Sequence, residues 1–173
     1  MSDEERQTWE ERYATGGYKS RQWPSELLES WVHRMPRGTA LDLPCGAGRN
    51  ALYLAESGFR VDAIDVSQSA LDIGEAEADR RGVQVRWHQA DLDTEDPPSV
   101  SYDLIVSCFY VNRTLIPRLK TWVTRNGFVV FEQHLATDLQ VQGPHKNSWR
   151  MAPGELLELF SDFQIVYYEE GVF

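Results

Sequence analysis

Residues 41–50, Leu-Asp-Leu-Pro-Cys-Gly-Ala-Gly-Arg-Asn, join an apolar run to a helical pattern through two glycines. Glycine adopts positive φ readily and has no side chain, so Gly46 and Gly48 would let a ligand lie against the main chain. The helix that follows presents unpaired N–H groups, which favour an anionic or polar ligand. One such glycine would fit an ordinary tight turn, but the pair predicts a nucleotide-like ligand here.

Two carboxylates end the next strand-like runs of the chain. Asp65 ends Val-Asp-Ala-Ile-Asp, where a carboxylate can accept hydrogen bonds from both hydroxyls of a ribose. Asp91 ends His-Gln-Ala-Asp and could accept from the exocyclic amine of adenine. The glycine spacing and the ribose acid also suit a nicotinamide cofactor. However, the sequence has no Tyr-x-x-x-Lys pair of the kind that one large dehydrogenase group uses.

The elements that must position these residues alternate between strand-like and helical patterns. Such alternation predicts an α/β fold, a Rossmann-like doubly wound and mostly parallel sheet with helices on both faces. Ligands of such sheets bind beyond the carboxyl ends of the strands. The expected strands are residues 39–43, 60–65, 83–89, 102–108, 127–134 and a sixth at 163–170. The expected helices are residues 2–13, 24–35, 49–57, 69–81, 113–123 and 153–160.

The 173 residues suggest a single domain with three parts. We expect two N-terminal lid helices in residues 1–38, a cofactor-binding core in residues 39–134, and a substrate loop with a C-terminal helix and strand in residues 135–173. A net charge of -10 disfavours nucleic acid as a partner. No apolar run is long enough to span a membrane, and the N-terminus lacks a secretion pattern, so we expect a cytoplasmic protein.

The ordered motifs resemble those of class I S-adenosylmethionine-dependent methyltransferases. The matching stretches are LDLPCGAG, VDAIDVS, QADL, YDLIVSC and NGFVVFEQH. With WEERYATGGY before the first strand, the chain looks like the small-molecule group that includes tellurite-resistance and thiopurine methyltransferases. The resemblance extends over residues 9–134 and implies S-adenosyl-L-methionine as cofactor. Pro44 departs from the family pattern, which commonly has a glycine at this position of the loop.

The resemblance implies a cofactor site made of strand ends and the first helix. In it the two glycines contact the methionine part, the two carboxylates and the Leu92 backbone contact ribose and adenine, and Val66 flanks the adenine ring. Ser107 lies near the amino group, and the first helix closes over the cofactor near its carboxylate. The implied residues are Trp9, Arg12, Tyr13, Gly46, Gly48, Asp65, Val66, Asp91, Leu92 and Ser107.

Methyl transfer is an in-line displacement in which the protein mainly aligns the reactants. The candidate catalytic residues follow the fourth and fifth strands: Tyr110, Arg113 and His134. His134 is the candidate general base, and Arg113 with Arg150 could bind an anion. The histidines lack partners at metal-ligand spacings, so we expect no metal. The expected acceptor is a small molecule, either a soft sulfur, selenium or tellurium nucleophile or a small anion.

Three further possibilities concern function and assembly. A module that binds S-adenosylmethionine without catalysis is the first alternative function, and a nicotinamide-dependent oxidoreductase is the second. In the resembling family a seventh, antiparallel strand closes the sheet, and we find no segment for it after residue 170. We therefore expect either a truncated form or a homodimer that pairs through the C-terminal edge strand.

Overall fold

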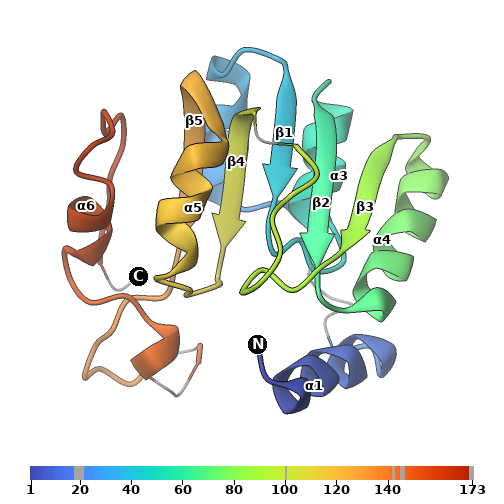
Figure 1. The fold of residues 1–173 in the computed structure, drawn as a ribbon, viewed down its shortest axis with the longest axis horizontal. Helices are drawn as coiled ribbons and strands as arrows, with labels where there is room; N and C mark the ends of the chain where they lie inside the picture. Colours follow the sequence, from blue (N-terminus) through green and yellow to red (C-terminus); the bar gives the residue numbers. More distant parts are fainter. Residues whose placement is uncertain (18–21, 100, 142, 145–146, 172–173) are drawn as a thin grey trace.

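A computed structural model describes residues 1–17, 22–99, 101–141, 143–144 and 147–171. Within these ranges, five strands form one sheet in the order β3-β2-β1-β4-β5, and every pairing between them is parallel (Figure 1). The strand order reverses beside β1, which is where sheets of this kind bind ligands. The strands are β1 (Thr39–Asp42), β2 (Arg60–Asp65), β3 (Val85–Gln89), β4 (Tyr102–Cys108) and β5 (Val123–Glu132). The predicted doubly wound α/β fold is therefore confirmed.

Helices cover both faces of the sheet and build a core on each side. One core contains Leu28, Leu54 and Leu71, which come from α2 (Glu26–Trp31), α3 (Arg49–Glu56) and α4 (Gln68–Arg81). The other contains Leu119 of α5 (Leu115–Trp122) and Phe160, which caps α6 (Glu155–Leu159). Apolar side chains at helical spacing thus bury against alternate residues of the strands, as a two-layered core requires. Two short 3-10 helices, Val32–Arg34 and Asn147–Trp149, complete the elements.

The two N-terminal helices have different positions. α1 (Asp3–Ala14) lies across the carboxyl ends of the strands (Figure 1) and buries none of its residues. Its predicted capping box is present, with Ser2 and Glu5 bonding each other's backbone amides. α2 instead packs on the sheet, with Leu28 fully buried, because its apolar stripe needs a core. Only α1 occupies a lid position.

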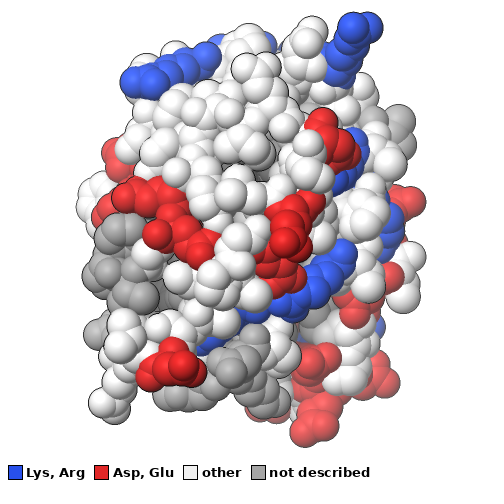
Figure 2. Space-filling model, turned by 90° about the vertical axis from the view of Figure 1, so that its left-hand side faces the viewer, with Lys and Arg blue, Asp and Glu red and all other residues white. Residues whose placement is uncertain are grey.

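The sixth strand predicted at residues 163–170 is absent, since residues 163–171 adopt no regular structure. Their β-branched and aromatic composition favours a strand, but a strand also needs a hydrogen-bonding partner. A groove of about 780 Å³ separates this segment from β5, and Ile165 and Val166 line it while remaining partly exposed to solvent. Figure 2 shows this side of the molecule, where uncharged surface is interrupted by patches of acidic side chains.

Candidate functional site

The loop between β1 and α3 is held by hydrogen bonds from its own backbone to β2. The amide of Cys45 donates to the carbonyl of Ile64 at 2.8 Å, and the amide of Gly46 donates to Oδ2 of Asp65 at 2.8 Å. Gly46 and Gly48 have φ of 54° and 78°, values that most other residues avoid. The sequence therefore forms the predicted turn, with both glycines in the left-handed region.

Gly46 and Gly48 leave space for different neighbouring side chains. A side chain at Gly46 would collide with the hydroxyl of Tyr13 in α1, whereas one at Gly48 would collide with the indole of Trp87 in β3. Gly46 lines the cavity at the carboxyl edge of the sheet, and Gly48 is not among its lining residues. The structure thus places Gly46 at the candidate site and Gly48 in the packing between loop and sheet.

Asp65 is a buried carboxylate at the end of β2. Besides the amide of Gly46, it accepts the amide of Ser67 on Oδ1 at 3.0 Å. Burial raises the pKa of Asp65, and these two amides oppose the shift because they stabilise the ionised form. Each oxygen has a second acceptor position, so the side chain still has the capacity to bind two hydroxyl groups.

One cavity of about 130 Å³ collects several of the predicted residues. Those that line it are Trp9, Tyr13, Gly46, Asp65, Val66 and Tyr110. Arg12 stacks on Trp9, with its guanidinium carbon 4.9 Å from the ring centroid. The cavity is also lined by residues for which the sequence predicts no role in the site, including Arg49, Asn50 and Phe109.

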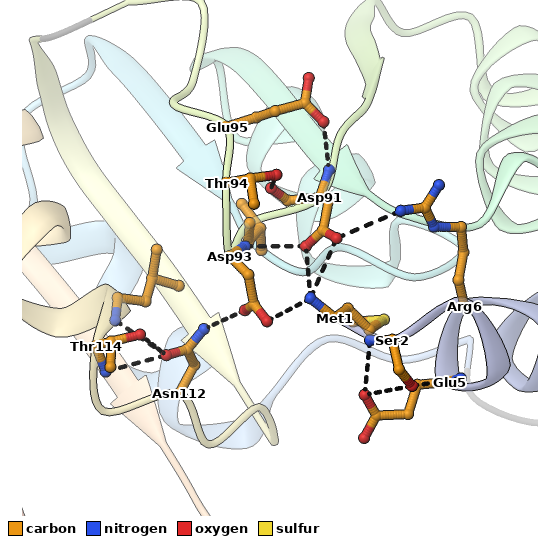
Figure 3. Close-up of polar contacts among 12 residues, drawn as sticks. Met1, Ser2, Glu5, Arg6, Asp91, Asp93, Thr94, Glu95, Asn112 and Thr114 are labelled. Carbon is orange, nitrogen blue, oxygen red and sulfur yellow. Dashed lines mark hydrogen bonds and ion pairs between the residues drawn. The ribbon is translucent and has the colours of Figure 1, made fainter.

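Asp91 lies at the border of this cavity. Its carboxylate contacts the N-terminal ammonium of Met1 at 3.2 Å and Nη2 of Arg6 at 3.5 Å (Figure 3), and Met1 itself lines the cavity. Burial acts to raise the pKa of Asp91, but the amide of Asp93 and the ammonium outweigh it, so the pKa is lowered. Leu92 buries its side chain in the core, and its carbonyl accepts from Arg118 at 2.8 Å.

Two buried polar atoms at neighbouring strand ends have no hydrogen-bond partner within the described residues. They are Oγ of Ser107 in β4 and Oδ1 of Asp42 in β1. Buried polar atoms are nearly always satisfied, so these two oxygens are candidate acceptors for a bound polar group. Burial raises the pKa of Asp42 to about 7, although the amide of Ala51 opposes that shift.

The three candidate catalytic residues differ in their surroundings. The hydroxyl of Tyr110 donates to Oδ1 of Asp93 at 3.2 Å, and burial raises its pKa to about 12. His134 packs against Phe109, with ring centroids 4.8 Å apart. Arg113 forms an ion pair with Glu155, whose Oε2 lies 2.8 Å from Nη2. Only Tyr110 of the three lines the cavity.

Arg150 makes its hydrogen bonds within the chain itself. The buried guanidinium of Arg150 donates to the carbonyls of Pro144 and Leu135 at 2.9 and 3.0 Å. His145 falls outside the described residues. Within the described ranges, no group of three or more His, Cys, Asp or Glu could hold a metal ion. No described helix is long and apolar enough to cross a membrane.

A parallel sheet with a glycine loop after β1 and carboxylates at the ends of β2 and β3 defines a Rossmann-like α/β protein with its ligand cavity at the switch point. Residues 40–127 match the methyltransferase domain family. The chain belongs to that family, as its motifs predict.

Several known proteins are similar to this chain. The probable S-adenosyl-L-methionine-dependent methyltransferase TehB of Haemophilus influenzae is 27% identical over 139 residues, which are 76% of this chain and 48% of that protein. The crystal structure of TehB from Haemophilus influenzae superposes with a TM-score of 0.76 and 23% identity, covering 94% of this chain and 58% of that one. The crystal structure of coclaurine N-methyltransferase bound to N-methylheliamine and SAH has a TM-score of 0.54 and 26% identity, covering 61% of this chain and 34% of that one. The chain spans about half the length of the TehB sequence that it matches.

Proposed function

We propose that the protein binds S-adenosylmethionine at the carboxyl edge of the sheet and transfers its methyl group to a small-molecule acceptor. The observation that carries this proposal is that Gly46, Asp65 and Val66 line one cavity, with Asp91 at its border. These residues end or follow three adjacent strands, so they can address the methionine, ribose and adenine parts of one ligand. Membership of the methyltransferase domain family supports the same reading.

The side chains present fit this cofactor. The carboxylate of Asp65 suits a ribose diol, and the lowered pKa of Asp91 keeps it ionised as an acceptor. Asp42 and Ser107 are buried at the ends of β1 and β4 and do not line the cavity, but their unpartnered oxygens are candidate acceptors for an ammonium group. At about 130 Å³ the cavity is smaller than the roughly 300 Å³ or more of typical ligand sites. α1 occupies part of this space, since Tyr13 touches Gly46, and we infer that α1 moves outward on binding.

The chemistry divides between cofactor and chain. When bound, the cofactor supplies a methyl group already activated by a sulfonium centre, so the chain needs chiefly to align the acceptor and exclude water. Trp9 and Tyr13 of α1 cover the cavity. Tyr110, with its pKa raised to about 12, stays protonated and acts as a hydrogen-bond donor. A thiolate or selenide acceptor needs no base. For an oxygen or nitrogen acceptor the proposed base is His134, which does not line the cavity but packs against Phe109 in its wall.

Calorimetry and turnover assays test this proposal together. The protein should bind S-adenosylmethionine and its demethylated product, and should methylate a member of a panel of thiols, selenite, tellurite and aromatic acids. Binding without turnover across a broad panel would favour a module that does not catalyse transfer. Binding of a nicotinamide cofactor in place of S-adenosylmethionine would favour an oxidoreductase.

We also propose that a second copy adds residues 163–170 to the free edge of β5. Antiparallel addition would bring Glu169 and Glu170 towards Arg125 near the start of β5, and would keep them away from Glu132 at its end. Exposed apolar side chains, Ile165 and Val166, support burial at this edge. Light scattering after size exclusion tests the assembly, and a one-chain mass at every concentration would contradict it.

A further inference from the structure

We propose that Arg49 is an anion-binding residue of the cavity and holds a carboxylate or oxyanion beside the site of methyl transfer. Resting on the proposed function, this inference assigns the charged group that the cavity recognises. The anion has two sources, the carboxylate of the cofactor's methionine part or an anionic acceptor. Arg49 is the first residue of α3 and directly follows the glycine loop.

The guanidinium of Arg49 is held in place at the cavity wall. It lines the cavity, and its central carbon lies 5.6 Å from the ring centroid of Phe109. Nη1 donates to the carbonyl of Trp23 at 3.3 Å. A guanidinium has five N–H donors, so this one hydrogen bond to the described part of the chain leaves enough donors to bind a carboxylate with two parallel hydrogen bonds.

Arg49 is the arginine that lines the cavity, and it has no acidic partner among the described residues. Among the described residues, no carboxylate lies within 4.0 Å of its guanidinium. By contrast, Arg86 pairs with Asp62 at 2.7 Å and Arg118 pairs with Asp96 at 2.6 Å. Arg113 and Arg150, from which the sequence predicted anion binding, make their contacts within the chain. Arg49 is therefore the cationic side chain in the cavity wall that remains available for an anion.

Phe109 supports this position at a conformational cost. It has φ of 59°, a left-handed value that is uncommon for a residue with a bulky side chain. Its amide donates to the carbonyl of Glu132 at 2.7 Å, which fixes the turn after β4. The ring contacts both the guanidinium of Arg49 and the imidazole of His134. Strained backbone of this kind gathers at functional sites, and here it places an aromatic face under the guanidinium.

The electrostatics of the chain make this local charge necessary. The net charge is -10 and Asp65 lies in the same cavity wall, while the ammonium of Met1 in that wall is already paired with Asp91 and Asp93. Arg49 lies close enough to oppose the rise in the pKa of Asp42 that burial causes. A bound carboxylate would therefore depend on Arg49, and on the shape of its planar fork as well as its charge.

Two ligands separate the sources of the anion. S-adenosylhomocysteine carries the amino-acid carboxylate, and 5′-methylthioadenosine keeps the nucleoside and thioether but lacks it. If the cofactor supplies the anion, Arg49→Gln should weaken the binding of S-adenosylhomocysteine by about 10- to 100-fold and leave the affinity for methylthioadenosine unchanged. If the acceptor supplies it, both affinities stay the same and KM for an anionic acceptor rises by a similar factor. In whichever quantity changes, the S-adenosylhomocysteine affinity or the acceptor KM, Arg49→Lys should have a value between those of wild type and Arg49→Gln.

The matched control is Arg60→Gln, which removes an exposed guanidinium at the amino end of β2. It should change none of these values. Unchanged S-adenosylhomocysteine affinity and unchanged acceptor KM in Arg49→Gln would overturn the proposal. If the wild type binds neither nucleoside, the proposed function fails separately. The anion site is then judged by the thermal shift that benzoate or selenite produces, which supports the proposal if Arg49→Gln abolishes it and overturns it otherwise.

Discussion

The carboxylate of Asp65 accepts the amide of Gly46 at 2.8 Å, so the end of β2 holds the loop that follows β1. Asp65→Ala should weaken S-adenosylmethionine binding by at least about tenfold, because it removes a buried hydrogen-bond acceptor from the cavity. Asp65→Asn keeps an oxygen for the Gly46 amide and should bind better than the alanine variant. Titration calorimetry measures both. Asp72→Ala, at an exposed position of α4, is the control, and an affinity in Asp65→Ala equal to this control would remove the ribose assignment.

Gly48 should matter for folding more than for the ligand. Its φ of 78° disfavours other residues, and a side chain there would also meet the ring of Trp87. Gly82 has a similar φ of 68° but open space around it. Gly82→Ala should therefore cost about 1 to 2 kcal/mol of unfolding free energy from backbone strain alone, and Gly48→Ala should cost clearly more because of overpacking. Urea unfolding measures the unfolding free energies of both variants. Equal losses would show that the ring of Trp87 moves aside without destabilising the fold.

Asp42 should make stability depend on pH. Burial raises its pKa from 3.8 to about 7 in the folded protein, so the folded state holds a proton that the unfolded state releases. The stability from this group is complete below about pH 4 and is lost as pH rises through about 7. Asp42→Asn lacks this titration. Its unfolding free energy relative to wild type should rise over this window, by at most on the order of 4 kcal/mol.

Unfolding in urea at several pH values measures that difference. Asp103→Asn is the control of opposite sign, because the Thr39 amide lowers the pKa of Asp103 below 3.8. The stability that Asp103 contributes is present above the unfolded pKa and lost as pH falls through the folded one. A constant difference between Asp42→Asn and wild type from pH 4 to 8 would contradict the raised pKa of Asp42.

The sheet was predictable because its strands and glycine loop are local patterns. β5 begins at Val123, four residues before the predicted start at 127, because α5 ends at Trp122 and runs directly into it. Residues 163–170 have the composition of a strand, but composition does not reveal whether a partner strand lies beside them. Pairing is a property of the assembled sheet, which explains why this prediction was wrong.

The sequence predicted the residues of the candidate site at the strand ends better than it predicted which arginine side chains face the cavity. Arg113 was selected for its place after β4, but its partner Glu155 lies 42 residues further on, a pairing that no local pattern reveals. Arg49 was read as the start of a helix, although its position directly after Gly48 at the carboxyl edge was a signal that it could face the ligand. Phe109 gave no signal, since its positive φ arises from the turn that follows β4.

Glu10 should hold α1 against the carboxyl edge of the sheet through its hydrogen bonds to the start of α4. Its carboxylate accepts the hydroxyl of Ser67 at 2.7 Å and both the hydroxyl and the amide of Ser69 at 2.5 and 3.1 Å. These groups belong to the N-terminus of α4, where negative charge is favourable. Glu10→Gln removes that charge, so hydrogen exchange across residues 3–14 should quicken by about two- to fivefold.

Release of α1 should also be visible in the kinetics of binding. Because α1 occupies part of the cavity, S-adenosylmethionine should associate faster with Glu10→Gln than with wild type in stopped-flow measurements. Glu11→Gln removes the neighbouring charge, an exposed carboxylate that accepts from the side chain of Gln7, and should leave the exchange and association rates near wild type. Equal hydrogen-exchange rates and equal association rates in Glu10→Gln and Glu11→Gln would mean that other contacts hold α1. Glu10 would then not control access to the cavity.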